Sequence, residues 1–243
     1  LDGSSAASDV YKRQHIGLGT NSSSLFVTMT SPGVIYKNLI IVGSSVSEGN
    51  PAAKGNIRAF DVNTGDLKWS FNTIPEIGED GHETYSDPDA YKRLGGANAW
   101  SGLTLDEERG ILYAPTGSVS YDFYGGDRVG DNLFANSIIA LSAETGNKIW
   151  HFQTVHHDVW DRDLPAPPIL FDYSMNDSII PSLAQVTKSG YIYLLNRITG
   201  KPLYDIIERP VPSKSNLEGE VLSKTQPIPT FPDPFSRQSL TKN

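Results

Sequence analysis

Short apolar runs alternate with polar turns along the middle of the chain, and three of these stretches share one pattern. Residues 56–69, 137–150 and 191–204 each contain an apolar run, a polar turn that ends in Thr-Gly, and an aromatic residue four positions after the glycine. Apolar runs of this length are typical of buried strands, and the glycine supplies the positive φ angle that a tight turn between strands needs. The pattern therefore predicts three related β-hairpins.

The spacing of the three turns indicates a repeated unit. Gly65, Gly146 and Gly200 lie 81 and 54 residues apart, which fits a period of about 50 with an insertion in the first gap. Further apolar runs at residues 39–43 and 111–114 supply more strands. Four-stranded blades of a β-propeller repeat in this way, and the aromatic residue of each unit can pack on the neighbouring unit. A β-sandwich whose turns are similar by chance is the alternative.

We therefore expect an all-β fold, a partial β-propeller formed by residues 15–243. Blades bury their faces against their neighbours, so the three predicted here do not close a ring. Residues 1–14 show no useful periodicity and are interpreted as a non-native leader. The chain is accordingly interpreted as an internal fragment of a longer protein.

Composition narrows the classes of function. The 243 residues carry a formal net charge of −8 and contain no cysteine. The acidic balance argues against a nucleic-acid partner. Without cysteine, this stretch has no disulfide, thiolate metal site or Cys-x-x-Cys-His haem attachment. No apolar run approaches the roughly 18 residues of a membrane-spanning helix.

The segment between the second and third repeats is the richest in candidate chemistry. Residues 153–168 hold two histidines, three aspartates and a tryptophan, followed by prolines. One interpretation is a solvated loop, and a second is a transition-metal site that uses His156 and His157. Adjacent histidines on a strand point to opposite faces, which argues against a chelate by both. The third interpretation is a carboxylate beside Trp160 that accepts a proton.

This segment, His-His-Asp-x-Trp-Asp-x-Asp-Leu-Pro-Ala-Pro-Pro, resembles a motif of the dehydrogenases that depend on pyrroloquinoline quinone (PQQ). Within that family it is most similar to the branch of membrane-bound glucose dehydrogenases and related sugar or polyol enzymes. The resemblance extends from about residue 28 to about residue 241, through several motifs in one order. These motifs lie at residues 42–48, 95–101, 113–118, 121–128, 130–136, 210–212 and 225–227.

The resemblance implies a propeller of roughly eight blades, with PQQ and a divalent cation, usually Ca²⁺, at its centre. It also implies a role for each matching residue. Asp161 matches the catalytic base, and Lys188 matches the basic residue that contacts the quinone carbonyls. Trp100 matches the indole that stacks on the cofactor, and Glu48 matches a carboxylate that ligates the cation.

The resemblance also bears on the second cation ligand and on the remaining polar residues. Ser118 stands where many relatives have asparagine, and its hydroxyl or carbonyl oxygen is the expected second ligand. His157 is expected to bind the cofactor, and both His156 and His157 are expected to line or support its site. Asp158 and Asp163 are expected either to orient their neighbours or to react. Asn98 and Asp122 are further candidates for the site.

The function implied by the resemblance is oxidation of a sugar or polyol by hydride transfer to the quinone, with Asp161 as general base. A PQQ-dependent alcohol dehydrogenase, a non-catalytic propeller scaffold and a carbohydrate-binding propeller are the alternatives. A scaffold would share the Thr-Gly turns but would need neither Glu48 nor Lys188. The expected electron acceptor is ubiquinone or a cytochrome. The expected location is the periplasm, with any inner-membrane anchor lying outside this stretch.

Overall fold

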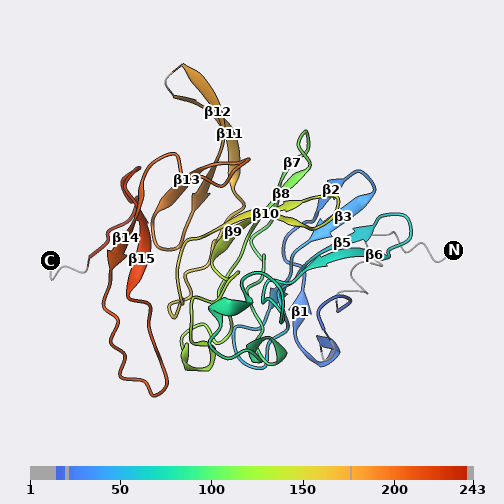
Figure 1. The fold of residues 1–243 in the computed structure, drawn as a ribbon. Helices are drawn as coiled ribbons and strands as arrows, with labels where there is room; N and C mark the ends of the chain where they lie inside the picture. The colour runs from blue at the N-terminus through green and yellow to red at the C-terminus, as the bar shows by residue number, and fades with distance from the viewer. Residues whose placement is uncertain (1–14, 20–21, 176, 240–243) are drawn as a thin grey trace.

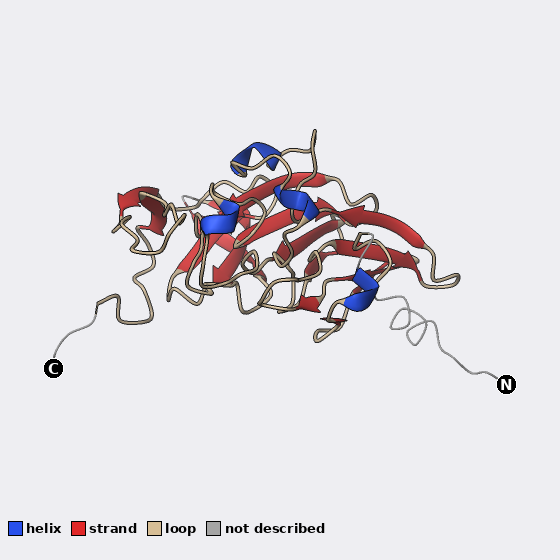
Figure 2. Ribbon diagram, turned by 90° about the horizontal axis from the view of Figure 1, so that it is seen from below, coloured by secondary structure: helices blue, strands red, loops and turns tan. Residues whose placement is uncertain are grey.

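The computed structural model describes residues 15–19, 22–175 and 177–239, so the predicted leader, residues 1–14, lies outside the described residues. Strands dominate the described chain. Its helices are single 3-10 turns that lie in the connections outside the sheets (Figure 2), namely η1 (Ser22–Ser24), η2 (His82–Thr84), η3 (Ala90–Lys92) and η4 (Gly126–Arg128). In this part of the chain, no helix has the length and apolar character needed to cross a bilayer.

Three antiparallel sheets stand side by side as blades (Figure 1). Within each blade, strands that pair follow one another along the chain. Blade one consists of β2 (Val34–Tyr36), β3 (Leu39–Val42), β5 (Ile57–Asp61) and β6 (Leu67–Phe71). Blade two consists of β7 (Thr104–Asp106), β8 (Ile111–Pro115), β9 (Ser137–Ser142) and β10 (Lys148–Gln153). Blade three consists of β11 (Ile169–Met175), β12 (Ser178–Val186) and β13 (Ile192–Asn196).

Blade two is buried on both faces, which explains its continuous apolar runs. All five residues of β8 are buried. Leu112 and Ala114 belong to the core shared with blade one, whereas Ile111 and Tyr113 belong to the core shared with blade three. Because successive side chains of a strand point to opposite faces, a strand between two neighbours needs apolar residues at every position.

The three Thr-Gly turns close in the same way. The last residue of the third strand of each blade is Asp61, Ser142 or Asn196, and its side-chain oxygen accepts hydrogen bonds from main-chain N–H groups two or three residues further on. The N–H of each turn glycine donates to the carbonyl oxygen of that same residue, at 2.8 to 2.9 Å. The glycines have φ angles of 71° to 75°, as the turn prediction requires.

The tryptophans that follow two of these turns join neighbouring blades. The indole N–H groups of Trp69 and Trp150 donate to main-chain carbonyls of the next blade, at 3.2 and 3.1 Å. A Cβ atom on Gly146 would stand 2.5 Å from the Trp69 ring, and one on Gly200 would stand 2.7 Å from the Trp150 ring. The prediction that the aromatic residue packs on the neighbouring unit is therefore confirmed for both tryptophans.

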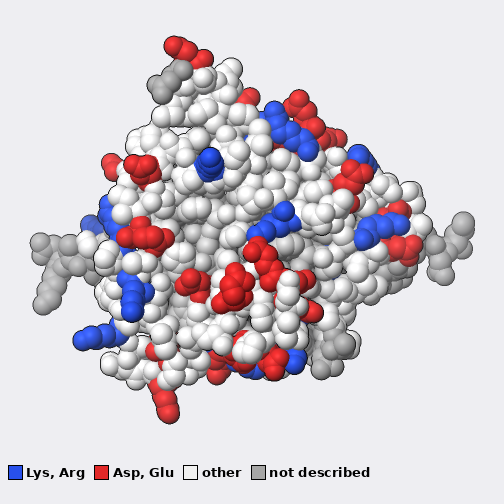
Figure 3. Space-filling view, in the orientation of Figure 1, with Lys and Arg blue, Asp and Glu red and all other residues white. Residues whose placement is uncertain are grey.

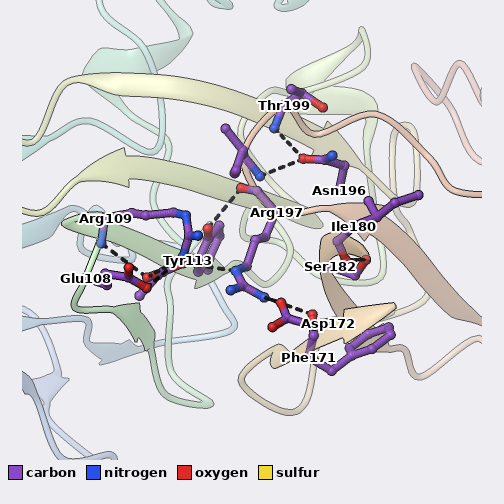
Figure 4. A network of polar contacts seen from close by, with 12 residues as sticks. Glu108, Arg109, Tyr113, Phe171, Asp172, Ile180, Ser182, Asn196, Arg197 and Thr199 are labelled. Atoms are coloured by element: carbon purple, nitrogen blue, oxygen red, sulfur yellow. Dashed lines mark hydrogen bonds and ion pairs between the residues drawn. The ribbon is translucent and has the colours of Figure 1, made fainter. Parts of the chain in front are cut away.

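A buried arginine strengthens the contact between blades two and three (Figure 4). The Arg197 guanidinium donates to the Asp106 carboxylate at 2.9 Å, to the Phe171 carbonyl at 2.8 Å and to the Asp172 carboxylate at 3.0 Å. Its main-chain carbonyl accepts a hydrogen bond from the Tyr113 hydroxyl at 2.9 Å. Asp106 and Tyr113 belong to blade two, so these bonds cross the interface.

The fourth strand of blade three is reduced to a short contact. After the turn, Leu203 donates to the Leu194 carbonyl at 2.9 Å, and Pro202 forms a bridge with Leu195. A proline has no N–H to give to a ladder, which interrupts the strand. The remaining strands form two separate pairs, β1 (Val27–Thr28) with β4 (Ser45–Val46) and β14 (Ile206–Pro210) with β15 (Thr225–Pro229).

The predicted fold class is confirmed. In the described residues the sheets form an open row of blades that does not close into a ring (Figure 1), as expected of a partial β-propeller. The outer blades leave apolar side chains uncovered: Ile35 in blade one is 54% exposed, and Ile169 and Ile179 in blade three are 67% and 71% exposed.

Candidate functional site

The predicted site residues lie on connections that leave the blades at one end. In a blade of four antiparallel strands, the connection between the second and third strands leaves from the same end as the connection to the next blade. The Thr-Gly turns close the opposite end. Glu48, Ser118 and Lys188 lie on the second-to-third connections of the three blades. Trp100 and Asp161 lie on the two connections between blades.

One cavity of about 180 Å³ gathers these connections. Four of the predicted residues line it, namely Glu48, Trp100, Ser118 and Lys188. Three of the further candidates line it as well, namely Asn98, Asp122 and Asp163. The topology thus brings residues that are far apart in the sequence into one hollow.

Trp100 follows a segment that is hydrogen-bonded to the connections of both blade one and blade two. Gly96 exchanges hydrogen bonds of 2.9 Å with the loop of residues 53–55, and Ala97 donates to the Ser118 carbonyl at 2.6 Å. Gly96 has a φ of +83°, and a Cβ atom there would stand 2.7 Å from the Ser118 carbonyl oxygen. Glycine is therefore required for this close approach, which sets where the indole lies.

Asp161 is paired with Lys188. The distance from the Lys188 Nζ atom to Asp161 Oδ1 is 2.8 Å, and the two side chains are 33% and 28% exposed. The same Nζ atom lies 5.7 Å from the centroid of the Trp100 ring. Asp161 has a φ of +52°, a left-handed conformation that aspartate adopts more readily than most residues. The predicted base, lysine and indole therefore form one group.

The surroundings favour a charged lysine and a carboxyl group that binds protons more readily than usual. Burial raises the pKa of Asp161 above its usual value; the hydrogen bond from Lys188 opposes this, and the charges of Asp163 and Glu48 raise it further. Burial lowers the pKa of Lys188, but its hydrogen bonds and charge interactions with the two aspartates raise the pKa above the ordinary value overall. An aspartate with a raised pKa is better matched to proton transfer near neutral pH.

Asp122 is a buried carboxyl group that the sequence named only as a further candidate. Burial raises its pKa to about 7, and the negative charges of Asp163, Asp161 and Glu48 contribute to this rise. Its side chain accepts no hydrogen bond from the described residues. The signal in the sequence was its place in the motif at residues 121–128, but the burial that makes it distinctive was not visible there.

Ser118, the predicted second cation ligand, already uses both of its oxygen atoms. Its hydroxyl donates to the Asp158 carboxylate at 2.5 Å, and its carbonyl accepts from Ala97. The same Asp158 carboxylate also accepts bonds from Asn136 at 3.1 Å and from the Arg162 main-chain N–H at 2.6 Å. Asp158 therefore orients its neighbours, which is one of the two roles considered for it.

The structure does not bring the two motif histidines into the cavity. His157 is buried, and its Nδ1 atom donates to the Gly130 carbonyl at 2.7 Å. A Cβ atom on Gly125 would stand 2.2 Å from His157 Nε2, so that edge of the ring faces main chain. Burial lowers the pKa of His157, so the ring is neutral at pH 7. A supporting role for this histidine fits its position better than contact with a cofactor.

His156 faces a different cleft, of about 690 Å³, between β10 and β14. Its ring lies 3.1 Å from the Glu208 carboxylate, and its main chain exchanges hydrogen bonds of 2.8 and 2.7 Å with the Gln226 side chain. These contacts tie the motif loop to the β14–β15 hairpin. This cleft contains none of the residues predicted to bind the cofactor or cation, so we place the candidate site in the smaller cavity.

Carboxylates outnumber cations around the smaller cavity. Glu48, Asp122 and Asp163 line it, and Asp161 lies beside it, against the single ammonium of Lys188. Figure 3 shows acidic side chains gathered near the middle of one face of the molecule. Among the described residues, no group of three or more His, Asp or Glu is close enough to hold a metal alone.

The cavity nevertheless fits both groups that the resemblance implies. Ca²⁺ prefers oxygen ligands. Burial and the neighbouring negative charges raise the pKa of Asp122, and a cation beside Asp122 and Glu48 would offset both effects. PQQ is a planar, anionic ring system. The Trp100 indole offers a surface on which such a ring can stack, and the Lys188 ammonium above the indole offers a charge opposite to that of the ring.

Comparison with known proteins decides the family. The family model described as PQQ: Glucose/ethanol/alcohol dehydrogenase, beta-propeller domain, matches residues 8–243. The chain belongs to this family. The match includes residues 8–14 of the segment that the sequence analysis interprets as a leader.

Curated relatives carry names that agree with this PQQ family. The quinate/shikimate dehydrogenase (quinone) of Acinetobacter baylyi is 40% identical over 94% of this chain and 28% of its own length. The quinoprotein glucose dehydrogenase of Escherichia coli is 36% identical over 82% of this chain and 25% of its own length. The chain therefore spans about a quarter of the length of the curated relatives that it matches.

A solved structure of the family has the same architecture. The quinohemoprotein alcohol dehydrogenase from Comamonas testosteroni superposes with a TM-score of 0.69 at 27% sequence identity. The superposition covers 88% of this chain and 32% of that one. The predicted resemblance to the PQQ-dependent dehydrogenases is confirmed, and the blades described above are part of a quinoprotein propeller.

Proposed function

We propose that this chain provides the catalytic face of a PQQ-dependent dehydrogenase that oxidises the CH–OH group of a sugar or polyol. One observation carries the proposal. Connections from three blades bring Glu48, Trp100 and Lys188 into one cavity, and Asp161 is hydrogen-bonded to that lysine at 2.8 Å. A scaffold or a plain sugar-binding propeller requires no such grouping.

Asp161 is the general base of the proposed reaction. Its carboxylate accepts the proton of the substrate hydroxyl, which allows the C–H hydrogen of the same carbon to leave with its electron pair. Its raised pKa favours this proton transfer, and the hydrogen bond and charge of the adjacent Lys188 oppose the rise in the pKa.

The remaining residues hold the cofactor and the cation. PQQ, when bound, supplies the acceptor for the hydride. Trp100 would stack on its ring plane, and Lys188 would place a positive charge at its carbonyl oxygens. Glu48 and Asp122 would ligate a divalent cation, with Ca²⁺ proposed. The hydroxyl of Ser118 is bound to Asp158, so Ser118 would contribute only through the second lone pair of its carbonyl oxygen.

The substrate, the electron acceptor and the location are part of the proposal. Relatives named for glucose, glycerol and quinate support a small polyhydroxylated substrate. The resemblance to the family supports ubiquinone or a cytochrome as acceptor and the periplasm as location.

The experiment that tests the function compares the wild-type protein with Asp161→Asn, both in the full protein that carries this chain. PQQ binding is measured by titration in the presence of Ca²⁺, and turnover is measured by dye reduction with glucose, glycerol, quinate and ethanol. We expect Asp161→Asn to retain PQQ and to lose about 10²- to 10⁴-fold in turnover, because removing a general base has an effect of this size.

Asp89→Asn is the matched control. Asp89 is an exposed carboxylate that pairs with Lys92 outside the cavity, so we expect wild-type turnover. Undiminished turnover in Asp161→Asn would remove Asp161 from the role of base. A wild-type protein that binds no PQQ would refute the dehydrogenase proposal and favour a scaffold.

A further inference from the structure

The Asp163 carboxylate contacts three other residues that line the cavity, Trp100, Ser118 and Lys188. Its Oδ2 atom accepts a hydrogen bond from the Trp100 indole N–H at 2.9 Å and lies 3.3 Å from the Lys188 ammonium. Its Oδ1 atom accepts from the Ser118 main-chain N–H at 2.8 Å and lies 3.3 Å from the Ser118 hydroxyl. One carboxylate thus contacts residues from the connections of blades one, two and three.

The fold makes room for this carboxylate at Gly117. A Cβ atom on Gly117 would stand 2.5 Å from Asp163 Oδ1, 2.9 Å from its Cγ and 3.2 Å from its Oδ2. These are the three nearest heavy atoms to that position, so the Asp163 carboxylate occupies the space that a side chain at residue 117 would take. Residue 117 is therefore a glycine because of this packing against Asp163, and not because of a turn.

The neighbouring Asp161 and Asp163 differ in a way that separates their roles. Asp163 is 9% exposed, and both of its oxygens are occupied by donors. Asp161 is more exposed and is held by the Lys188 ammonium through Oδ1, and no donor among the described residues reaches its other oxygen. A buried carboxylate whose two oxygens both accept hydrogen bonds is held in one position, and it can fix the position of the groups that donate to it.

We propose that Asp163 is a positioning residue of the cofactor site, which holds the Trp100 indole and the Lys188 ammonium in one arrangement. This inference rests on the proposed function. The hydrogen bond at Nε1 prevents the indole from rotating within the site, and the same oxygen draws the ammonium over the ring. Asp163 thereby fixes the relative placement of the surface on which PQQ would stack and the charge that would face its carbonyls.

The first test needs no cofactor. The rate of acylation of Lys188 by an N-hydroxysuccinimide ester is measured by mass spectrometry in the full protein. In Asp163→Asn, one of the two carboxylates that keep this amine protonated is neutral. We expect Lys188 to react about threefold faster, which corresponds to about half a unit in the pKa of the amine. Gly117→Ala, which displaces the Asp163 carboxylate without changing its charge, should raise the rate in the same direction.

The second test uses the holoenzyme. We expect Asp163→Asn and Gly117→Ala to bind PQQ about tenfold or more weakly, by quenching of tryptophan fluorescence, because the stacking surface and the lysine lose their common support. The acid limb of kcat/KM against pH should also move to lower pH in Asp163→Asn. The charges that act on Asp161 are those of Lys188, Asp163 and Glu48, and removing that of Asp163 lowers the pKa of the base.

Asp106→Asn is the matched control. Asp106 is also a buried carboxylate paired with a basic residue, here Arg197, but it lies at the interface of blades two and three. It should lower the melting temperature and leave Lys188 reactivity, PQQ affinity and the acid limb unchanged. If Asp163→Asn behaves like this control, Asp163 is only structural and the inference fails. If the wild-type protein binds no PQQ, the proposed function fails, and unchanged Lys188 labelling would then refute the positioning role separately.

Discussion

Single glycines determine how closely the parts of this fold approach one another. Gly146 combines two demands: its φ is +75°, and a Cβ atom would stand 2.5 Å from the ring of Trp69 in the preceding blade. The first demand is local to the turn, whereas the second comes from the neighbouring blade. The two costs should add, because backbone strain and steric overlap have different origins.

Gly146→Ala should therefore destabilise the protein by about 3 kcal/mol, the sum of a left-handed alanine and an overpacked tryptophan. Gly78→Ala separates the two contributions. Gly78 has a φ of +90°, but a Cβ atom there would meet no atom of the surrounding fold within 4 Å, so only about 1 kcal/mol is expected. Urea unfolding of both variants measures the difference. Equal losses would show that the Trp69 contact carries no cost.

Interfaces between blades are the next level of organisation, and one buried arginine shows how they are held. The Arg197 side chain is 11% exposed, and that of its partner Asp106 is 6% exposed. Arg109 also approaches Asp106, at 3.2 Å, but its side chain is 32% exposed. The same carboxylate therefore has one buried and one largely solvated partner, and these should differ in energy.

Arg197→Met should cost about 3 to 5 kcal/mol, because it leaves the Asp106 carboxylate buried at the interface with a weaker partner. Arg109→Met should cost less than about 1 kcal/mol, as is usual for ion pairs that reach solvent. Thermal unfolding of the two variants makes the comparison. A larger loss for Arg109→Met would mean that the interface is held in another way.

Over the whole molecule, the antiparallel order of strands collects negative charge at one end of the blades. Glu48, Asp122 and Asp163 come from different connections, and no single segment of the chain would bring them together. Burial, together with the neighbouring negative charges, raises the pKa of one of these carboxyl groups, Asp122, to about 7. The negative charge of these carboxylates lowers the free energy of unfolding unless a bound proton or cation offsets it.

The pH dependence of stability follows from the sign of this shift. The folded-state pKa of Asp122, about 7, lies above the value of about 3.9 for an unfolded chain. The stability that the protonated carboxyl contributes is complete below about pH 4 and is lost as the pH rises through about 7. Without a divalent cation, Asp122→Asn should therefore be more stable than wild type at pH 8, by up to about 4 kcal/mol, and equal to it near pH 4.

Ca²⁺ should reverse the order at pH 8. It is expected to raise the melting temperature of the wild-type protein and to have a much smaller effect on Asp122→Asn, because an amide ligates the cation more weakly than a carboxylate. Asp89→Asn, outside the cavity, should respond to Ca²⁺ as wild type does. An equal response of Asp122→Asn would remove Asp122 from the proposed ligands.

The sequence by itself determined the repeating unit and the family. The Thr-Gly turns, their aromatic partners and the continuous apolar strands are local patterns, because a turn and a strand are set by neighbouring residues. The same locality let the motif at residues 153–168 indicate the family and single out Asp161, which the structure then places against Lys188.

Only the tertiary structure decided which polar residues share the cavity and in which state. Asp122 and Asp163 look alike in the sequence, yet one is a carboxyl group with a raised pKa and the other is saturated with hydrogen bonds. His157 belongs to the motif but lies outside the cavity, facing Gly125 and Gly130. Burial and hydrogen bonding between distant segments arise from blade packing, and no local pattern of residues contains that information.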